Sequence, residues 1–175
     1  MRYVVVCDVL GEGGRFNNNL RREVYEKLGV KSSSLPAHFT IKAPFEHEGS
    51  IEDLEKVLEV FCHKEHAAPF RLKGYDHFDD KVVYMHVDMS DEGQAMHSRL
   101  IDAISEVPYL IFDKKDGKDK IFHVTVSSKK VAPIYNKLWD YVHQYPCDFE
   151  CMFDNISLYR WDGYKWRLHK RFELR

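Results

Sequence analysis

Two short stretches, His38-Phe39-Thr40-Ile41 and His123-Val124-Thr125-Val126, have the same order of histidine, apolar residue, threonine and apolar residue. Both stretches are rich in the β-branched and aromatic residues that favour strands, and an amphipathic helical segment follows each of them. Because side chains alternate between the two faces of a strand, each histidine shares a face with its own threonine. The pattern therefore predicts two strands that bury an apolar face and present an imidazole and a hydroxyl on the other.

The segments around the first stretch alternate between strand and helix periodicity. We expect strands at 2–10 and 38–44, helices at 17–28 and 51–61, and a hairpin formed by strands 70–78 and 81–89. The glycine-rich stretch from Gly11 to Gly14 is expected to be a flexible loop after the first strand. Ser50 is expected to cap the second helix.

The same order of segments then appears again. We expect helices at 90–104 and 132–145 and strands at 121–127, 149–161 and 164–174, the last two joined by a turn at Asp162-Gly163. The predicted fold is α+β, a bilobal duplicated β-α-β-α-β arrangement with two antiparallel sheets facing a central cleft and helices outside. We expect one domain over 1–175, with halves of about 1–89 and 90–175, and exchange of strands between the lobes stays open.

Composition narrows the class of protein. The chain has 26 Lys and Arg against 28 Asp and Glu, a formal net charge of −2, which excludes a histone-like, uniformly basic surface. The apolar run that starts at Val4 is cut by Asp8 and is too short for a signal or membrane segment. The four cysteines lack metal-binding spacing, which favours a reducing compartment. We therefore expect a cytoplasmic protein, which we take to be a monomer, without membrane contact.

The repeated stretches predict a particular chemistry if the two lobes bring their polar faces together. Two imidazoles with pKa values near about 6.5 can divide the roles of general base and general acid at neutral pH. Two threonine hydroxyls can donate hydrogen bonds to the oxygens of a phosphate as charge develops on it. We therefore predict that His38, Thr40, His123 and Thr125 are the catalytic residues.

The two motifs, placed on strands of a duplicated α/β chain, resemble those of the 2H phosphoesterase superfamily. Within it the chain is similar to bacterial 2′-5′ RNA ligase-like proteins and cyclic phosphodiesterases, and the resemblance covers essentially the whole chain. It implies the same four catalytic residues, with no metal and no other cofactor. It also implies that the substrate is a 2′,3′-cyclic phosphate or a 2′-5′ phosphodiester of RNA or a nucleotide.

Seven further residues are candidates for substrate binding. Lys42 and Ser127 continue the two His-Thr faces by one alternate position and can contact a phosphate, although the position favours a solvated residue at a strand end. Aromatic and cationic residues interleave in the last hairpin, which suits base stacking and phosphate binding but also an edge hairpin with packed aromatics. The other five candidates are Tyr84 and His86, which share a face, and Tyr159, Arg160 and Trp161 in that hairpin.

The resulting hypothesis is a metal-independent phosphoesterase that works by two-histidine general acid/base catalysis. One histidine deprotonates the attacking water and the other protonates the leaving ribose oxygen, and the sequence does not assign these roles. Whether the protein also joins 2′-5′ RNA linkages stays open. One alternative is a module that binds RNA ends with little turnover, and another is a hydrolase of small nucleotides that does not act on RNA. His63 and His66 are not expected to bind zinc.

Overall fold

The computed structural model describes residues 1–175 and contains two four-stranded antiparallel sheets with four α-helices. The first sheet has the order β2 (His38–Glu46), β1 (Arg2–Asp8), β7 (Asn155–Trp161) and β8 (Trp166–Glu173). The second sheet has the order β5 (His123–Ser127), β4 (Val82–Met89), β3 (Ala68–Phe78) and β6 (Asp148–Phe153). The predicted α+β class with two antiparallel sheets is confirmed.

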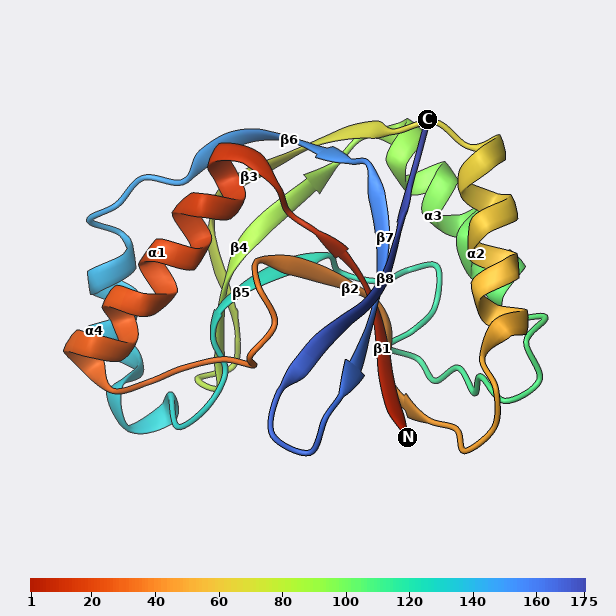
Figure 1. Ribbon diagram of the computed structural model, residues 1–175. Coiled ribbons are helices and arrows are strands. Elements are labelled where there is room, and N and C mark those ends of the chain that lie inside the picture. The colour runs from red at the N-terminus through yellow and green to blue at the C-terminus, as the bar shows by residue number, and fades with distance from the viewer.

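The helices lie at the two ends of the molecule, outside the sheets. Figure 1 shows α1 (Gly11–Leu28) and α4 (Tyr135–Val142) on the left, and α2 (Glu52–Lys64) and α3 (Asp91–Ile104) on the right. The short 3₁₀ turn Ala132–Ile134 precedes α4. Each helix buries one apolar face against the sheets or its neighbouring helix, which is how amphipathic helices are stabilised.

Each sheet takes strands from both halves of the sequence. The first sheet joins β1 and β2 to β7 and β8, and the second joins β3 and β4 to β5 and β6. As a result, the two motif strands β2 and β5 are the edge strands of different sheets, and they lie next to each other. The sheet order therefore brings together two stretches that are far apart in the sequence.

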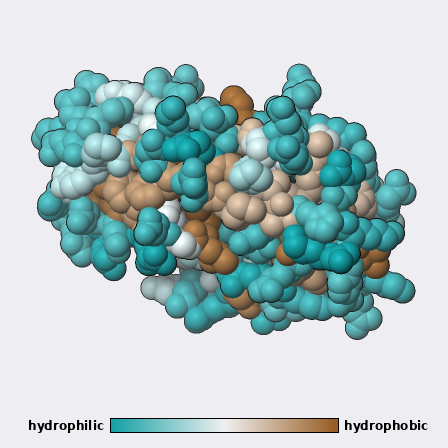
Figure 2. Space-filling view, turned by 90° about the horizontal axis from the view of Figure 1, so that it is seen from above, coloured by the Kyte–Doolittle hydropathy of each residue, from teal (hydrophilic) through white to brown (hydrophobic).

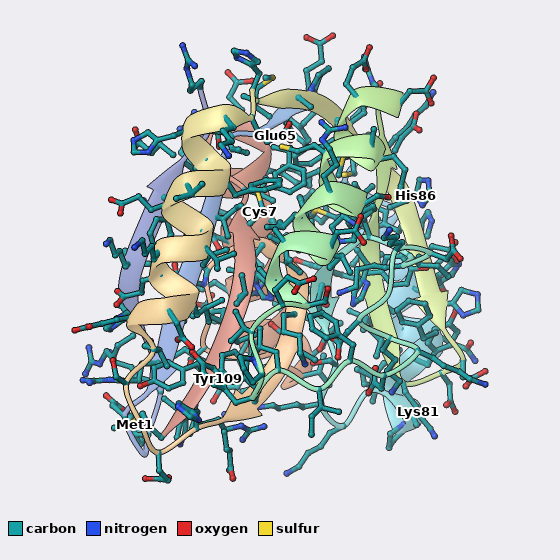
Figure 3. The ribbon with its side chains drawn as sticks, turned by 90° about the vertical axis from the view of Figure 1, so that its right-hand side faces the viewer. Met1, Cys7, Glu65, Lys81, His86 and Tyr109 are labelled. Carbon is teal, nitrogen blue, oxygen red and sulfur yellow. The ribbon has the colours of Figure 1, made fainter.

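One hydrophobic core connects the two sheets beneath the motif strands. The ring of Phe39 makes edge-to-face contacts with Phe70, Phe122 and Phe153 at centroid distances of 5.5, 5.2 and 5.0 Å. Phe122 directly precedes the second motif, so the apolar sides of both motifs meet in one packed cluster. All four cysteines are free and buried, and Figure 3 shows Cys7 in the interior behind the α2 and α3 helices.

The expected loop at Gly11 to Gly14 is wrong, because these residues form the first turn of α1. A Cβ on Gly14 would lie 1.8 Å from the carbonyl oxygen of Val9, and a Cβ on Gly13 would lie 2.8 Å from the sulfur of Cys151. The glycines permit close packing of the helix start against the end of β1 and against β6. They do not provide flexibility here.

The expected single strand 149–161 is also wrong, because the chain changes sheets at Asp154. Residues before it form β6 of the second sheet, and residues after it form β7 of the first. Strand periodicity on both sides hides this transfer from the sequence. The cap of α2 is Ile51, with Ser50 one residue earlier, where its hydroxyl accepts the N–H of Glu52. The predicted turn at Asp162-Gly163 is confirmed, with Gly163 at φ +95°.

One face of the molecule is covered mainly by hydrophilic residues (Figure 2). Figure 2 shows the face seen from above in Figure 1, where hydrophilic residues cover both ends and hydrophobic residues gather in a band across the middle. None of the helices combines the length and the hydrophobicity that crossing a bilayer requires.

Candidate functional site

The two motif histidines are held in the same way. The Nδ1 atom of His38 lies 2.7 Å from the carbonyl oxygen of Pro36, and that of His123 lies 2.9 Å from the carbonyl oxygen of Ile121. A carbonyl oxygen can only accept, so Nδ1 carries the hydrogen in each ring. In the neutral imidazole Nε2 is then the free proton acceptor, as a general base requires.

The two motif threonines lie on the same strand faces as the histidines. Thr40 and Thr125 are half-buried, whereas the intervening Phe39 and Val124 are completely buried. The carbonyl oxygen of Thr40 accepts from Lys120, and that of Thr125 accepts from Asn17. The backbones of both threonines are therefore fixed by residues from outside their own sheets, which holds the two hydroxyls in place.

Both motif strands contain an irregularity directly after the threonine. In β2, Thr40 pairs with Val6 but Lys42 pairs with Val5, so one extra residue lies between them. In β5, Thr125 pairs with Tyr84 but Ser127 pairs with Val83. A bulge of this kind breaks the alternation of side chains and redirects the residues that follow.

The structure does not bring Lys42 or Ser127 to the open His-Thr face. Lys42 is 3% exposed, and its ammonium lies 2.9 Å from a carboxylate oxygen of Asp116. Ser127 is 0% exposed, and its hydroxyl donates to the carbonyl oxygen of Lys31. Each residue instead anchors its strand to a connecting segment from the other half of the chain.

Helix α1 holds the two motif strands together through consecutive asparagines that the sequence reasoning missed. Asn17 donates its amide to the carbonyl oxygen of Thr125 at 3.2 Å. The side-chain oxygen of Asn18 accepts the N–H of Ala37, the residue before the first motif, at 2.9 Å. The available signal was the run Asn17-Asn18-Asn19, because asparagine is unfavourable inside a helix unless its side chain has a specific partner.

A buried polar network lies beside His38. Asp8 is the register partner of His38 and is 2% exposed. Its carboxylate accepts the hydroxyl of Tyr159 at 3.0 and 3.1 Å and a guanidinium N–H of Arg171 at 2.6 Å. Arg171 also donates to Ser157. A carboxylate at the end of a buried valine run was the signal for this network, since buried charges are normally paired.

The surroundings of His123 are aromatic. Its ring lies 5.1 Å from Phe78 and 5.3 Å from Tyr84 between centroids, and Tyr84 is 3% exposed. His86 is the register partner of His123 and is exposed, and Figure 3 shows it on the outer side of the molecule. Of these two candidates from β4, the structure thus brings the Tyr84 ring against His123 and leaves His86 with its side chain in solvent.

Burial sets the protonation of both imidazoles. It lowers the pKa of His38 to about 4, although the carbonyl of Pro36 opposes the shift; the guanidinium of Arg21 lowers this pKa further and the carboxylate of Asp8 raises it. Burial also lowers the pKa of His123 below its ordinary value, with the ammonium of Lys120 adding to the shift. The charge of His123 contributes to lowering the pKa of His38, so the two rings interact. Both imidazoles are therefore neutral at pH 7.

The three hairpin candidates fall into different environments. Tyr159 is buried, 4% exposed, and its hydroxyl serves the Asp8 network. Arg160 is exposed at the register position opposite Tyr3. Trp161 packs edge-on against Trp166 at 5.4 Å and lines a surface groove. Of the three, Trp161 therefore borders the groove.

The described residues include no group of three or more His, Cys, Asp or Glu side chains arranged to hold a metal ion. His63 and His66, near the end of α2, are exposed. The groups that the site offers for chemistry are therefore imidazoles, hydroxyls and the surrounding cations.

Comparison with known proteins gives one family and one fold. A model of the 2′-5′ RNA ligase superfamily matches residues 15–165. The structure of TT0787 from Thermus thermophilus aligns with a TM-score of 0.69 at 14% identity, covering 100% of this chain and 98% of that one. Escherichia coli LigT in its apo form aligns with a TM-score of 0.59 at 17% identity, covering 99% and 96%.

A further LigT structure, in complex with 3′-AMP, aligns with a TM-score of 0.61 at 14% identity, covering 99% of this chain and 97% of that one. No curated protein matches the sequence significantly. At these identities the solved structures establish a shared fold.

Proposed function

The chain belongs to the 2′-5′ RNA ligase superfamily of 2H phosphoesterases, and on that premise we propose that it hydrolyses a 2′,3′-cyclic phosphate or a 2′-5′ phosphodiester of RNA or a nucleotide. His38 and His123 act as general base and general acid, and Thr40 and Thr125 bind the phosphate. One observation carries the proposal: on two adjacent edge strands, each histidine has its Nδ1 bound to the carbonyl two residues earlier. This shared anchoring leaves two Nε2 atoms free for proton transfer.

The reaction needs one proton removed and one proton supplied. Nε2 of one neutral histidine accepts a proton from water, whose oxygen then bonds to phosphorus. The bond between phosphorus and one ribose oxygen breaks, and that oxygen takes a proton from Nε2 of the other, protonated histidine. The product of a cyclic phosphate is a phosphomonoester with a free ribose hydroxyl. The two histidines exchange protonation states during the turnover, so solvent must restore them.

The lowered pKa values of His38 and His123 fit this scheme. A bound phosphate carries negative charge, and a negative charge beside an imidazole favours the imidazolium form. Substrate binding therefore raises the pKa of the histidines from the value of about 4 at His38 toward neutrality, and one ring becomes protonated as the acid. This predicts a bell-shaped dependence of kcat/KM on pH.

Ligation uses the same two histidines with a different nucleophile. A ribose 5′-hydroxyl replaces water on the cyclic phosphate, one histidine takes its proton, the other protonates the 3′ oxygen as it leaves, and the product is a 2′-5′ diester. In the reverse reaction the 3′-hydroxyl attacks the diester, the cyclic phosphate forms again and the 5′-hydroxyl is released, with the two histidine roles interchanged by microscopic reversibility. Hydrolysis is expected to prevail in dilute solution because water is in large excess.

The test is a screen of the purified protein against 2′,3′-cyclic nucleotides and 2′-5′-linked dinucleotides in the presence of EDTA. We expect turnover by the wild type and its loss in His38→Ala and His123→Ala, while His66→Ala, an exposed histidine near the end of α2, behaves as the wild type. Loss of activity in EDTA that zinc or magnesium restores would contradict the mechanism. Binding of RNA ends with no turnover would favour the alternative of a binding module.

A further inference from the structure

A groove of about 700 Å³ lies between the second half of α1, the connection from α1 to β2, and the β7–β8 hairpin. Its lining contains five cationic side chains and no carboxylate, although the whole chain has a net charge of −2. Asp162, in the hairpin turn, accepts N–H groups of Tyr164 and Lys165 and pairs with Arg167. The cations of the groove are Arg21, Arg22, Lys31, Lys129 and Lys165.

Aromatic rings lie among these cations. Tyr25 and Tyr164 are 52% and 85% exposed. The ammonium of Lys31 lies over the Tyr25 ring, 5.6 Å from its centroid, whereas the Tyr164 ring is open to a ligand. Trp161 and Trp166 pack edge-on next to the hairpin turn, and the backbone N–H of Trp166 donates to the hydroxyl of Ser34. Exposed aromatic rings between cations suit a ligand that has both flat bases and phosphates.

The groove borders the α1–β2 connection directly before the first motif, and Lys129 just beyond the second motif strand. Pro36, which lines it, provides the carbonyl that fixes His38. The guanidinium of Arg21 donates to the carbonyl oxygens of Ser33 and Leu35 at 2.8 Å each, which holds this connection against α1. On the other side, the backbone of Lys129, two residues beyond β5, donates to the carbonyl oxygen of Lys31 at 2.9 Å.

We propose that this groove binds the single-stranded RNA chain that continues from the phosphate held between His38 and His123. The inference rests on the proposed function, because only that function places a scissile phosphate beside the groove. Phosphates of the chain contact the cations, and its bases stack on the exposed tyrosine and tryptophan rings. The protein therefore acts on the ends of oligonucleotides in preference to mononucleotides, which are too short to occupy the groove.

Two variants test the groove without touching the histidines or their anchors. Arg22→Ala/Lys165→Ala removes two cations from opposite walls; the guanidinium of Arg22 bonds only to Asn19 on its own helix. Tyr164→Ala removes the most exposed ring. The matched control is Lys56→Ala/Lys64→Ala, two exposed cations on α2 at the opposite end of the molecule in Figure 1.

The first readout is the ratio of kcat/KM for an oligoribonucleotide ending in a 2′,3′-cyclic phosphate to kcat/KM for a cyclic mononucleotide. We expect the double variant to lower this ratio at least about 10-fold at low salt. The slope of the logarithm of the ratio against the logarithm of the salt concentration should become shallower by about 1.4, because each of the two phosphate contacts on a single strand contributes about 0.7. Tyr164→Ala is expected to lower the ratio about 5- to 160-fold, the range for one lost base stack. The control leaves the ratio unchanged.

The second readout is fluorescence anisotropy with a labelled oligoribonucleotide that ends in a 3′-hydroxyl and cannot react. It measures RNA binding by the groove even if the wild type hydrolyses nothing. Absence of hydrolysis would contradict the proposed function and leave the binding test valid. We expect salt-sensitive binding that weakens in both groove variants. An unchanged ratio and unchanged binding in the double variant would overturn the inference, as would equal losses in the α2 control. Preference for an acidic protein over RNA would overturn it too.

Discussion

His38 on β2 lies opposite Asp8 and beside a network that includes Tyr159 and Arg171, whereas His123 on β5 packs against the rings of Phe78 and Tyr84. Their backbones are nearly equivalent: both strands bulge after the threonine, and both rings bond to the carbonyl two residues earlier. The repeated sequence thus places equivalent groups in equivalent positions. The residues around each motif are not repeated, and they determine the pKa of each histidine and how firmly each motif strand is held.

The anchoring of the two strands differs in the same way. Lys42 forms a buried ion pair with Asp116, from the segment before β5, and Lys120 in that segment donates to the carbonyl oxygens of Thr40 and Ile41. The equivalent Ser127 makes one neutral hydrogen bond to Lys31. Burial raises the pKa of Asp116, but the Ala43 N–H and Lys42 together hold it below its ordinary value. The β2 strand is therefore fixed by charge and the β5 strand mainly by packing.

The largest effect is expected from His38→Ala and His123→Ala. Each removes one proton-transfer group, so kcat/KM for a 2′,3′-cyclic nucleotide should fall about 10²- to 10⁴-fold in both variants. The comparison predicts similar losses but different pH profiles, because Asp8 and Arg21 act on His38 and Lys120 acts on His123. Steady-state kinetics from pH 5 to 9 measure both. A rate close to wild type for either variant would remove that histidine from the mechanism.

The second effect separates the two anchors. Asp116→Ala leaves the buried ammonium of Lys42 without its carboxylate partner and with one carbonyl acceptor, that of Ala43, and we expect a loss of about 3–5 kcal/mol in the free energy of unfolding. Ser127→Ala removes one neutral hydrogen bond and should cost about 1 kcal/mol. Urea denaturation at pH 7 compares them, with the exposed Asp119→Ala from the same segment as control. Equal losses of unfolding free energy in Asp116→Ala and Ser127→Ala would mean that the buried ion pair holds its strand no more firmly than the neutral hydrogen bond does.

A smaller effect is expected from Thr40→Val and Thr125→Val. Each removes one hydrogen-bond donor to the phosphate, worth up to about 3 kcal/mol, so kcat/KM should fall by at most about 10²-fold. Valine keeps the β-branched shape that strands prefer, so the thermal unfolding midpoint should change little. The two variants should lose activity alike if the motifs are functionally equivalent. Threonine variants that lose more activity than the histidine variants would reverse the proposed roles.

The smallest effect concerns the packing behind the second motif, where His97 lies against Phe122. His97 is 0% exposed, neither ring nitrogen has a hydrogen-bond partner, and burial lowers its pKa to about 4. In the unfolded chain the imidazole of His97 has a pKa of about 6.5, so as the pH falls it binds a proton before the folded protein does. The stability due to neutral His97 is therefore present above about pH 6.5 and is lost as the pH falls toward 4.

His97→Leu should therefore flatten the dependence of stability on pH, by on the order of 2 kcal/mol between pH 7 and pH 5. Urea midpoints of the variant and the wild type at the two pH values measure the difference. His63→Leu serves as control, since the side chain of His63 is exposed in the folded protein. Parallel pH curves for His97→Leu and the wild type would show that this ring does not couple the second motif to acid unfolding.

The amino-acid sequence by itself predicts most of the secondary structure and the four groups at the candidate site. Strand and helix periodicities identify the elements because apolar faces must be buried, and the alternation in His-Φ-Thr-Φ (Φ, apolar) places each histidine beside its threonine. It also predicts the α+β class, since two antiparallel sheets with helices outside are the way to bury these faces. These are local properties, which a short window of residues specifies.

Other features depend on contacts between distant segments, and only the tertiary structure decides them. The switch of sheets at Asp154, the tight packing of Gly14 on Val9 and the burial of Lys42 against Asp116 have no local signature. The same holds for the asparagines of α1 that connect both motifs. Periodicity predicts which face of an element is buried, but it does not predict which other element that face packs against. The partner of a buried charge or the register of an edge strand is chosen by the free energy of the whole fold.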